Sequence, residues 1–142
     1  MNPYVIAGML VAATSGAAAT GAEAMPAACT AEHFAEARSL SQLPTAVAQT
    51  LGRDVPGLEG IADRGGRFNP TDVPSPGLPM KRFTLAALGK DCVLVVIERG
   101  GIAHYFSLLA FERTGPVWRM TELGLLPGPP VTLQELLAGA RK

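Results

Sequence analysis

Histidine is the side chain most often used for metal binding and for proton transfer near neutral pH, and the chain has two, His33 and His104. A zinc site needs further ligands at close spacing, and the sequence holds neither an H-E-x-x-H motif nor a His-x-His pair. His104 precedes Tyr105 in an alternating stretch, where it could act as a general base or an ion ligand. The favoured alternative is a partly buried ring that is hydrogen-bonded across a sheet. The sequence therefore predicts no metal and no cofactor.

A second group of polar residues lies in one glycine-rich stretch. Arg64 and Arg67 flank two glycines, and two cations beside flexible backbone N–H groups suit an anionic or carboxylate partner. The stretch is not a phosphate-binding loop, because no Gly-Lys-Ser or Gly-Lys-Thr follows, and a plain turn at the two glycines is favoured over the anion site. The nearby acidic residues lack the spacing of a calcium loop, and Asp72 is expected to form a turn. The candidate binding residues of the whole chain are Arg64, Arg67, Asn69, Asp72, His104 and Tyr105.

Motifs for nucleophilic or acid–base catalysis are missing from the sequence. There is no G-x-S-x-G, and neither Ser75 nor Ser107 has a recognisable base partner. Glu98 and Glu112 stand at the ends of predicted strands, but two carboxylates work as acid and base only when folding brings them into one cleft. We therefore predict no catalytic residue, and a non-enzymatic protein is favoured over an enzyme.

The first 24 residues are predicted to form a removable secretory signal peptide. Tyr4–Ala13 is an apolar run that is shorter than the roughly 20 residues of a membrane helix, and small residues follow it. Residues 22–24 read Ala-Glu-Ala, which fits the cleavage rule and makes Met25 the first mature residue; cleavage after Ala19 is the second candidate. No Lys or Arg precedes the apolar run, which departs from the pattern. The alternative is a disordered N-terminus on a cytosolic protein.

The two cysteines support export independently. Cys29 and Cys92 both lie in the predicted mature chain, and two thiols of one small domain pair in an oxidising compartment. A redox-active pair would have C-x-x-C spacing, so we predict a structural disulfide, which stabilises the fold by roughly 4 kcal/mol in the chain-entropy model. Lipidation at Cys29 is the rival interpretation, but the Leu usually found three residues earlier is missing. The predicted location is periplasmic or extracellular.

Length and charge limit the class of protein. The chain of 142 residues suffices for one domain with one core, expected over residues 25–142. Twelve basic and twelve acidic residues balance, which gives no electrostatic reason to expect a nucleic-acid or anionic-membrane partner. No apolar segment of spanning length follows the signal, so the mature chain is predicted to lack a transmembrane segment.

The predicted elements run in the order helix, loop, strands, helix. A helical pattern begins at Thr30 and ends near Leu40, and a second covers Pro44–Leu51, which gives a bent helical hairpin or two helices. Residues 52–80 contain six Gly and five Pro and are expected to form a long irregular loop. Residue patterns then predict the strands 81–88, 92–99, 102–113 and 117–126, and a capping box at Thr132 starts a helix over Leu133–Ala140.

These elements predict an α+β fold. An N-terminal helix or helix pair packs on a four-stranded antiparallel meander sheet, a short C-terminal helix follows, and the helices are expected to cover one face of the sheet. The continuous β-branched run Cys92–Arg99 predicts a central strand that is buried on both faces. The order resembles the cystatin-like and nuclear-transport-factor-like arrangements, in architecture only.

Two functional hypotheses follow from this sequence. The first is a small exported binding protein, such as an inhibitor or immunity-type protein, that recognises a protein or cell-envelope partner through residues 52–80 and the adjacent sheet. The second is a small-ligand-binding or minor enzymatic domain with a pocket between helix and curved sheet, with His104, Tyr105 and Glu98 as its site residues. An accessory role in envelope assembly is a third hypothesis.

Overall fold

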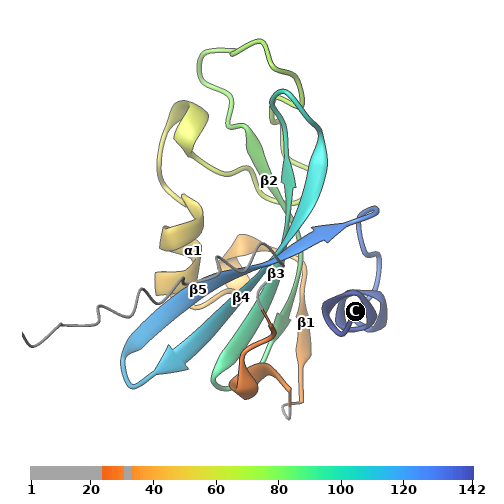
Figure 1. Cartoon of the computed structure of the whole chain (residues 1–142). Coiled ribbons are helices and arrows are strands. Elements are labelled where there is room, and N and C mark those ends of the chain that lie inside the picture. Colours follow the sequence, from red (N-terminus) through yellow and green to blue (C-terminus); the bar gives the residue numbers. More distant parts are fainter. Residues whose placement is uncertain (1–23, 31–32) are drawn as a thin grey trace, which may run out of the picture.

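The computed structural model describes residues 24–30 and 33–142 (Figure 1). Five antiparallel strands form one sheet in the order β1-β2-β3-β4-β5. The strands are β1 (Ala35–Ala37), β2 (Lys81–Leu88), β3 (Cys92–Arg99), β4 (Tyr105–Thr114) and β5 (Val117–Leu126). The helices of the described residues are α1 (Thr45–Leu51), α2 (Leu133–Ala140) and the short 3-10 turns η1 (Ala27–Cys29), η2 (Leu40–Gln42) and η3 (Gly57–Glu59).

The predicted four-stranded sheet under an N-terminal helix pair is wrong, because part of the first predicted helix is a strand. Ala35–Ala37 forms β1, which pairs antiparallel with β2 and adds a fifth strand. The Thr30 hydroxyl donates to the Ala27 carbonyl and thus closes η1 instead of capping a long helix. The helical propensity of this alanine-rich stretch is a few tenths of a kcal/mol per residue, and pairing with the sheet outweighs it.

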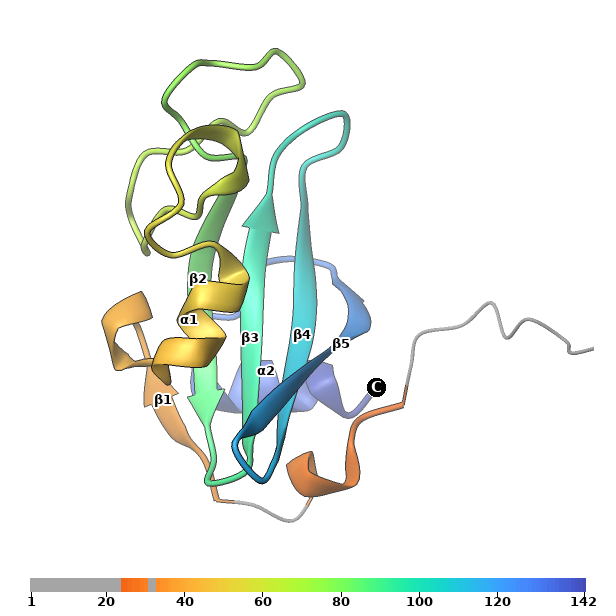
Figure 2. The ribbon, with the colours of Figure 1, turned by 90° about the vertical axis from the view of Figure 1, so that its left-hand side faces the viewer.

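The helices cover both faces of the sheet, which corrects the prediction that they share one. Figure 2 shows α1 and α2 on opposite sides of the strands. The buried residues on the α1 face are Ala37, Leu40, Leu43, Val47, Ala48, Leu51, Phe83, Ala86, Val93, Val95, Ile97, Leu109 and Phe111. Those on the α2 face are Cys29, Leu85, Ala87, Cys92, Leu94, Val96, Leu108, Ala110 and Leu136. One sheet therefore separates two apolar layers.

β3 supplies both layers. Its residues from Cys92 to Glu98 are all buried, and alternate side chains belong to the two clusters. The burial of this strand on both faces, expected from its continuous apolar run, is confirmed.

Four of the predicted elements have the same first and last residues in the structure, and β4 begins later than expected. β2, β3, β5 and α2 cover the predicted residues, but the predicted strand from Ile102 starts only at Tyr105. The segment between β3 and β4 instead packs against the long loop, where the Gly100 N–H donates to the Met80 carbonyl over 2.8 Å. A Cβ on Gly100 would collide with the backbone of Asn69, so this approach requires glycine.

Cys29 and Cys92 form a disulfide, as the sequence predicts. The bridge joins η1 to the first residue of β3, and both cysteines are buried in the α2-face cluster. It lies at the end of the sheet opposite the long loop (Figure 1). Among the described residues, no helix has both the length and the apolar character needed to cross a membrane.

Removing the disulfide should lower the free energy of unfolding by about 4 kcal/mol, because the bridge closes a long loop with a sequence separation of 63 residues. The test is the double substitution Cys29→Ala and Cys92→Ala, measured by denaturant unfolding. Wild-type protein kept in reductant is the matched control and should unfold at the same denaturant concentration as the double variant. Equal stability of the variant and the oxidised wild type would contradict the prediction.

Candidate functional site

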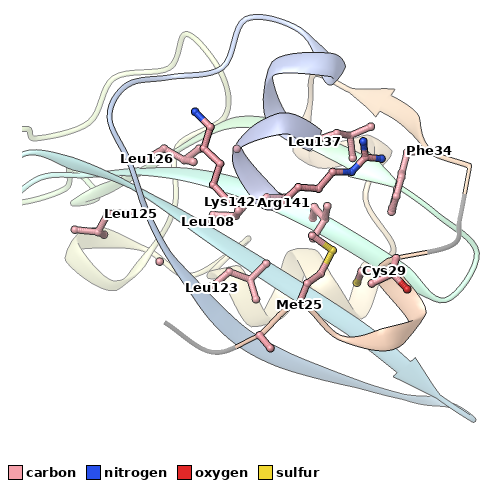
Figure 3. A pocket seen from close by; sticks show the side chains of 16 residues that line it. Met25, Cys29, Phe34, Leu108, Leu123, Leu125, Leu126, Leu137, Arg141 and Lys142 are labelled. Carbon is pink, nitrogen blue, oxygen red and sulfur yellow. The ribbon is translucent and has the colours of Figure 1, made fainter. Parts of the chain in front are cut away.

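One opening in the described part of the chain lies on the α2 face of the sheet. It is a cavity of about 650 Å³ between α2, β4, β5 and the N-terminal segment (Figure 3). Its lining is mostly apolar. The lining residues are Ala24, Met25, Cys29, Thr30, Phe34, Leu94, Leu108, Leu123, Gly124, Leu125, Leu126, Leu137, Gly139, Ala140, Arg141 and Lys142.

The floor of this cavity depends on an irregularity in β5. The register between β4 and β5 shifts where Leu108 pairs with Gly124 and Leu109 pairs with Glu122, so that Leu123 is an extra residue. Such a bulge re-aims side chains, and Leu123 and Leu126 both pack on the α2-face cluster although they are three residues apart. Gly124 has a φ of 139° and contributes no side chain to the lining. The bulge therefore places two leucines beside the cavity, and Gly124 leaves space in it because it has no side chain.

The wall formed by α2 is fixed in place by caps at its first turn. The Thr132 hydroxyl accepts from the Glu135 N–H, which confirms the predicted start of the helix. Only this half of the predicted capping box forms, because the Glu135 carboxylate accepts from the Val131 N–H instead of the Thr132 N–H. The Glu36 carboxylate, on the edge strand β1, accepts from the Leu133 N–H over 2.9 Å. An acidic group at a helix N-terminus is also favoured by the helix dipole. Leu136 is then fully buried against the sheet, whereas Leu137 and Ala140 line the cavity.

The third side of the cavity is the N-terminal segment. Ala24 and Met25 line it beside Cys29, whose disulfide holds η1 against β3. Figure 3 shows Met25 next to Cys29. The exposed residues Arg141 and Lys142 follow α2 directly and belong to the same lining. The site is thus an apolar cavity with a cationic margin.

A polar cluster lies further along the same face, around the nearly buried carboxylate of Glu98. Arg82 donates to Glu98 Oε2 from Nε and Nη2, over 2.9 Å and 2.7 Å. His104 Nε2 lies 2.8 Å from Glu98 Oε1. The guanidinium of Arg82 stacks 4.3 Å from the ring centroid of Phe68, which ties the long loop to the sheet. His104 and Glu98, both named in the ligand-binding hypothesis, are therefore in contact, but neither lines the cavity.

Two of the predicted loop residues are engaged in holding the loop. The Arg64 guanidinium donates to the Thr84 carbonyl over 2.9 Å. Asn69 is buried; its amide donates to the Val73 carbonyl, and its Oδ1 accepts from the N–H and the hydroxyl of Thr71. Both side chains thus shape the loop or fasten it to β2.

The remaining predicted residues lie apart from the cavity. Arg67 and Asp72 are exposed on the loop. Tyr105 lies opposite Arg99 in the β3–β4 register, one position along from His104 and therefore on the other face of the sheet. The structure brings His104 together with Glu98, but it does not gather the six predicted binding residues into one site.

Tyr105 belongs to a shallow depression of about 350 Å³ on the α1 face, together with Lys81 and Arg99. Burial lowers the pKa of the Lys81 ammonium, the nearby Arg99 cation lowers it further, and Glu59 acts in the opposite direction. Lys81 Nζ donates to the Leu51 carbonyl over 2.9 Å, and Arg99 Nε donates to the Ser107 hydroxyl over 2.8 Å. These two cations therefore support the end of α1 and the middle strands of the sheet.

Reasoning from the sequence missed the residues that form the cavity. The signal that could have indicated them is Gly124, because a glycine inside a strand pattern often marks a bulge or a close approach. The leucines around it were read as ordinary strand residues. Among the described residues, no three His, Cys, Asp or Glu side chains gather as metal ligands.

Comparison of the chain with known protein families, with curated proteins and with solved structures gives no match. The function is therefore argued from the geometry above.

Replacing Glu98 with Ala should lower the free energy of unfolding by about 2 kcal/mol, because Arg82 and His104 then lose their carboxylate in a partly buried place. Only 11% of the Glu98 side chain is exposed, so water replaces the lost contacts poorly. Thermal or denaturant unfolding measures the change.

The matched control is Asp54→Asn, which neutralises the carboxylate of the more exposed Arg53–Asp54 pair. Its effect should be less than about 0.5 kcal/mol, since exposed ion pairs contribute little and Asn tolerates the positive φ of this position. Equal losses in the two variants would mean that the Glu98 cluster does not hold the loop to the sheet.

Proposed function

We propose that this protein is a small exported binding module that holds one largely apolar small molecule in the cavity between α2 and the sheet. The observation that carries the proposal is the cavity of about 650 Å³ with a mostly apolar lining. Ligand sites in proteins have volumes of roughly 300–1,000 Å³ and mostly apolar walls with a few placed polar groups. This cavity has both properties.

The rest of the fold favours binding in this place over a packing defect. Protein interiors are filled nearly as densely as organic crystals, and the central residues of both layers are fully buried. The cavity walls come from five parts of the chain, namely the N-terminal segment, β3, β4, β5 and α2, and a disulfide and a capped helix hold two of them. Rigid walls around an apolar space are what a preformed ligand site requires.

Export is part of the proposal. The disulfide suits an oxidising compartment, and the predicted cleavage site lies directly before Met25, at the start of the described chain. A periplasmic or extracellular binding module needs no catalytic residue.

The hypothesis that residues 52–80 capture a protein partner stays a prediction. Arg67 and Asp72 are the exposed candidates for it, since Arg64 and Asn69 are engaged within the fold. The enzymatic variant of the second hypothesis has less support, because the cavity lining does not include His104 or Glu98.

Filling the cavity should abolish binding of apolar ligands. Ala140→Phe adds a ring at a lining position of α2, and Ala138→Phe adds the same ring at an exposed position of the same helix. We expect the first variant to bind an apolar fluorescent probe at least tenfold more weakly than wild type, and the second to bind it normally.

Circular dichroism and thermal unfolding of both variants check that the fold is retained. Probe binding that is equally strong in wild type and Ala140→Phe, or equally weak in both phenylalanine variants, would contradict the assignment of the cavity. Native mass spectrometry should detect any ligand that copurifies with the wild type. The same ligand should be present in Ala138→Phe and missing from Ala140→Phe.

The export proposal predicts a particular mass for the protein recovered from a secreting host. A chain that begins at Met25, with no thiol available to alkylation until reductant is added, is the expected result. A full-length chain with two free thiols would overturn export. A mass that corresponds to cleavage after Ala19 would keep export and reject the first cleavage site.

A further inference from the structure

Among the described residues that line the cavity, the charged side chains all have one sign. They are Arg141 and Lys142, and none of these described lining residues is an Asp or Glu. Both residues are exposed, whereas Leu94 and Leu108 of the floor are buried. The lining is therefore mostly apolar with two cations at its margin, and Figure 3 shows the Arg141 side chain extending toward Phe34 and the Lys142 side chain toward Leu126.

No ion pair neutralises these two cations within the described residues, whose salt bridges all involve other basic side chains. Two acidic groups at the start of α2 are already engaged. Glu135 accepts from the Val131 N–H, and Glu36 accepts from the Leu133 N–H and pairs with Arg38. Two cations at the margin of an apolar cavity, without carboxylate partners, suit an anionic group that the ligand supplies.

We infer that the ligand is a single-chain amphiphile with an anionic headgroup, whose chain lies in the apolar cavity and whose headgroup lies at Arg141 and Lys142. This inference rests on the proposed function and adds the chemical class of the ligand. Arginine and lysine differ in what they offer: arginine gives a planar pair of donors to a carboxylate or phosphate, and lysine gives a point charge. Neither side chain recognises the alkyl chain of the ligand, so the cavity alone selects the length of that alkyl chain.

The predicted maturation step adds to the same charge. Met25 lines the cavity, and cleavage after Ala24 would remove Ala24 from the lining and leave a free α-ammonium group on Met25. Mature protein would then have one more cation beside the cavity than the uncleaved chain. Signal removal and ligand binding are in this way connected through one residue.

Ligands that share a twelve-carbon chain and differ in the headgroup test the inference. Laurate, dodecyl phosphate, dodecanol and dodecyltrimethylammonium would be titrated against the oxidised protein below the concentrations at which they form micelles. We expect the two anions to bind about tenfold more tightly than dodecanol, with the cation weakest, because hydrogen bonds to charged groups are worth a factor of this order. The relative affinities of laurate and dodecyl phosphate assign the headgroup to a carboxylate or a phosphate source.

Variants locate the headgroup on the protein. The double substitution Arg141→Gln and Lys142→Gln should weaken laurate about tenfold and leave dodecanol unchanged. The matched control, Lys90→Gln with Arg119→Gln, removes the same charge from exposed positions outside the cavity lining. It should change neither the affinity for laurate nor the affinity for dodecanol. Raising the salt concentration should weaken laurate alone, since screening acts on the charged headgroup.

The outcomes separate this inference from the proposed function. Equal binding of laurate and dodecanol, both blocked by Ala140→Phe, would overturn the anionic headgroup and keep the apolar ligand site. No binding of any chain, or binding that Ala140→Phe does not affect, would overturn both. Laurate, decanoate and octanoate then give the contribution of the chain, with a gain of about fourfold for each added methylene that is buried.

Discussion

The burial of β3 on both faces is the constraint from which the rest of the structure follows. A strand whose residues from Cys92 to Glu98 are all buried needs an apolar layer on each side and a paired strand at each edge. The chain supplies these with two short helices on opposite faces and with β2 and β4 beside β3. The α1 face is filled by η2 and α1. On the other face, α2 and η1 leave part of the layer open, and this is where the cavity lies.

The disulfide and the β5 bulge act on that open part of the layer in complementary ways. Cys29–Cys92 attaches the N-terminal segment to β3 and so fixes one wall without filling the space. The bulge at Leu123 turns two leucines toward the cavity, and Gly124 adds no side chain that would fill it. A regular strand would place Leu123 and Leu126 on opposite faces and close off less apolar surface. The cavity is thus a product of covalent and backbone features that constrain its walls.

The sequence predicts those parts of the fold whose patterns are strong and local. The period of two in β2 and β5, the continuous apolar run of β3 and the capping box of α2 give the right residues, because each element follows its own pattern. β1 was missed because three residues are too few to show a period, and only their partners in β2 make them a strand. The cavity was missed for a related reason: a bulge shifts register by one residue, and nothing in a single strand's sequence states which partner it skips.

The candidate site differs between sequence and structure because polar residues in a glycine-rich loop serve the loop first. Asn69 satisfies its own neighbours, Arg64 holds a strand carbonyl, and Glu98 with Arg82 fastens the loop through Phe68. Buried or half-buried polar groups must be hydrogen-bonded, so such residues are occupied by the requirements of folding. Arg141 and Lys142 face no such requirement, since they follow the last helix, are exposed and have no acidic partner in the described residues. Cations that the fold does not use, placed beside apolar surface that the fold does not cover, are what distinguishes the cavity from the loop as the place for a ligand.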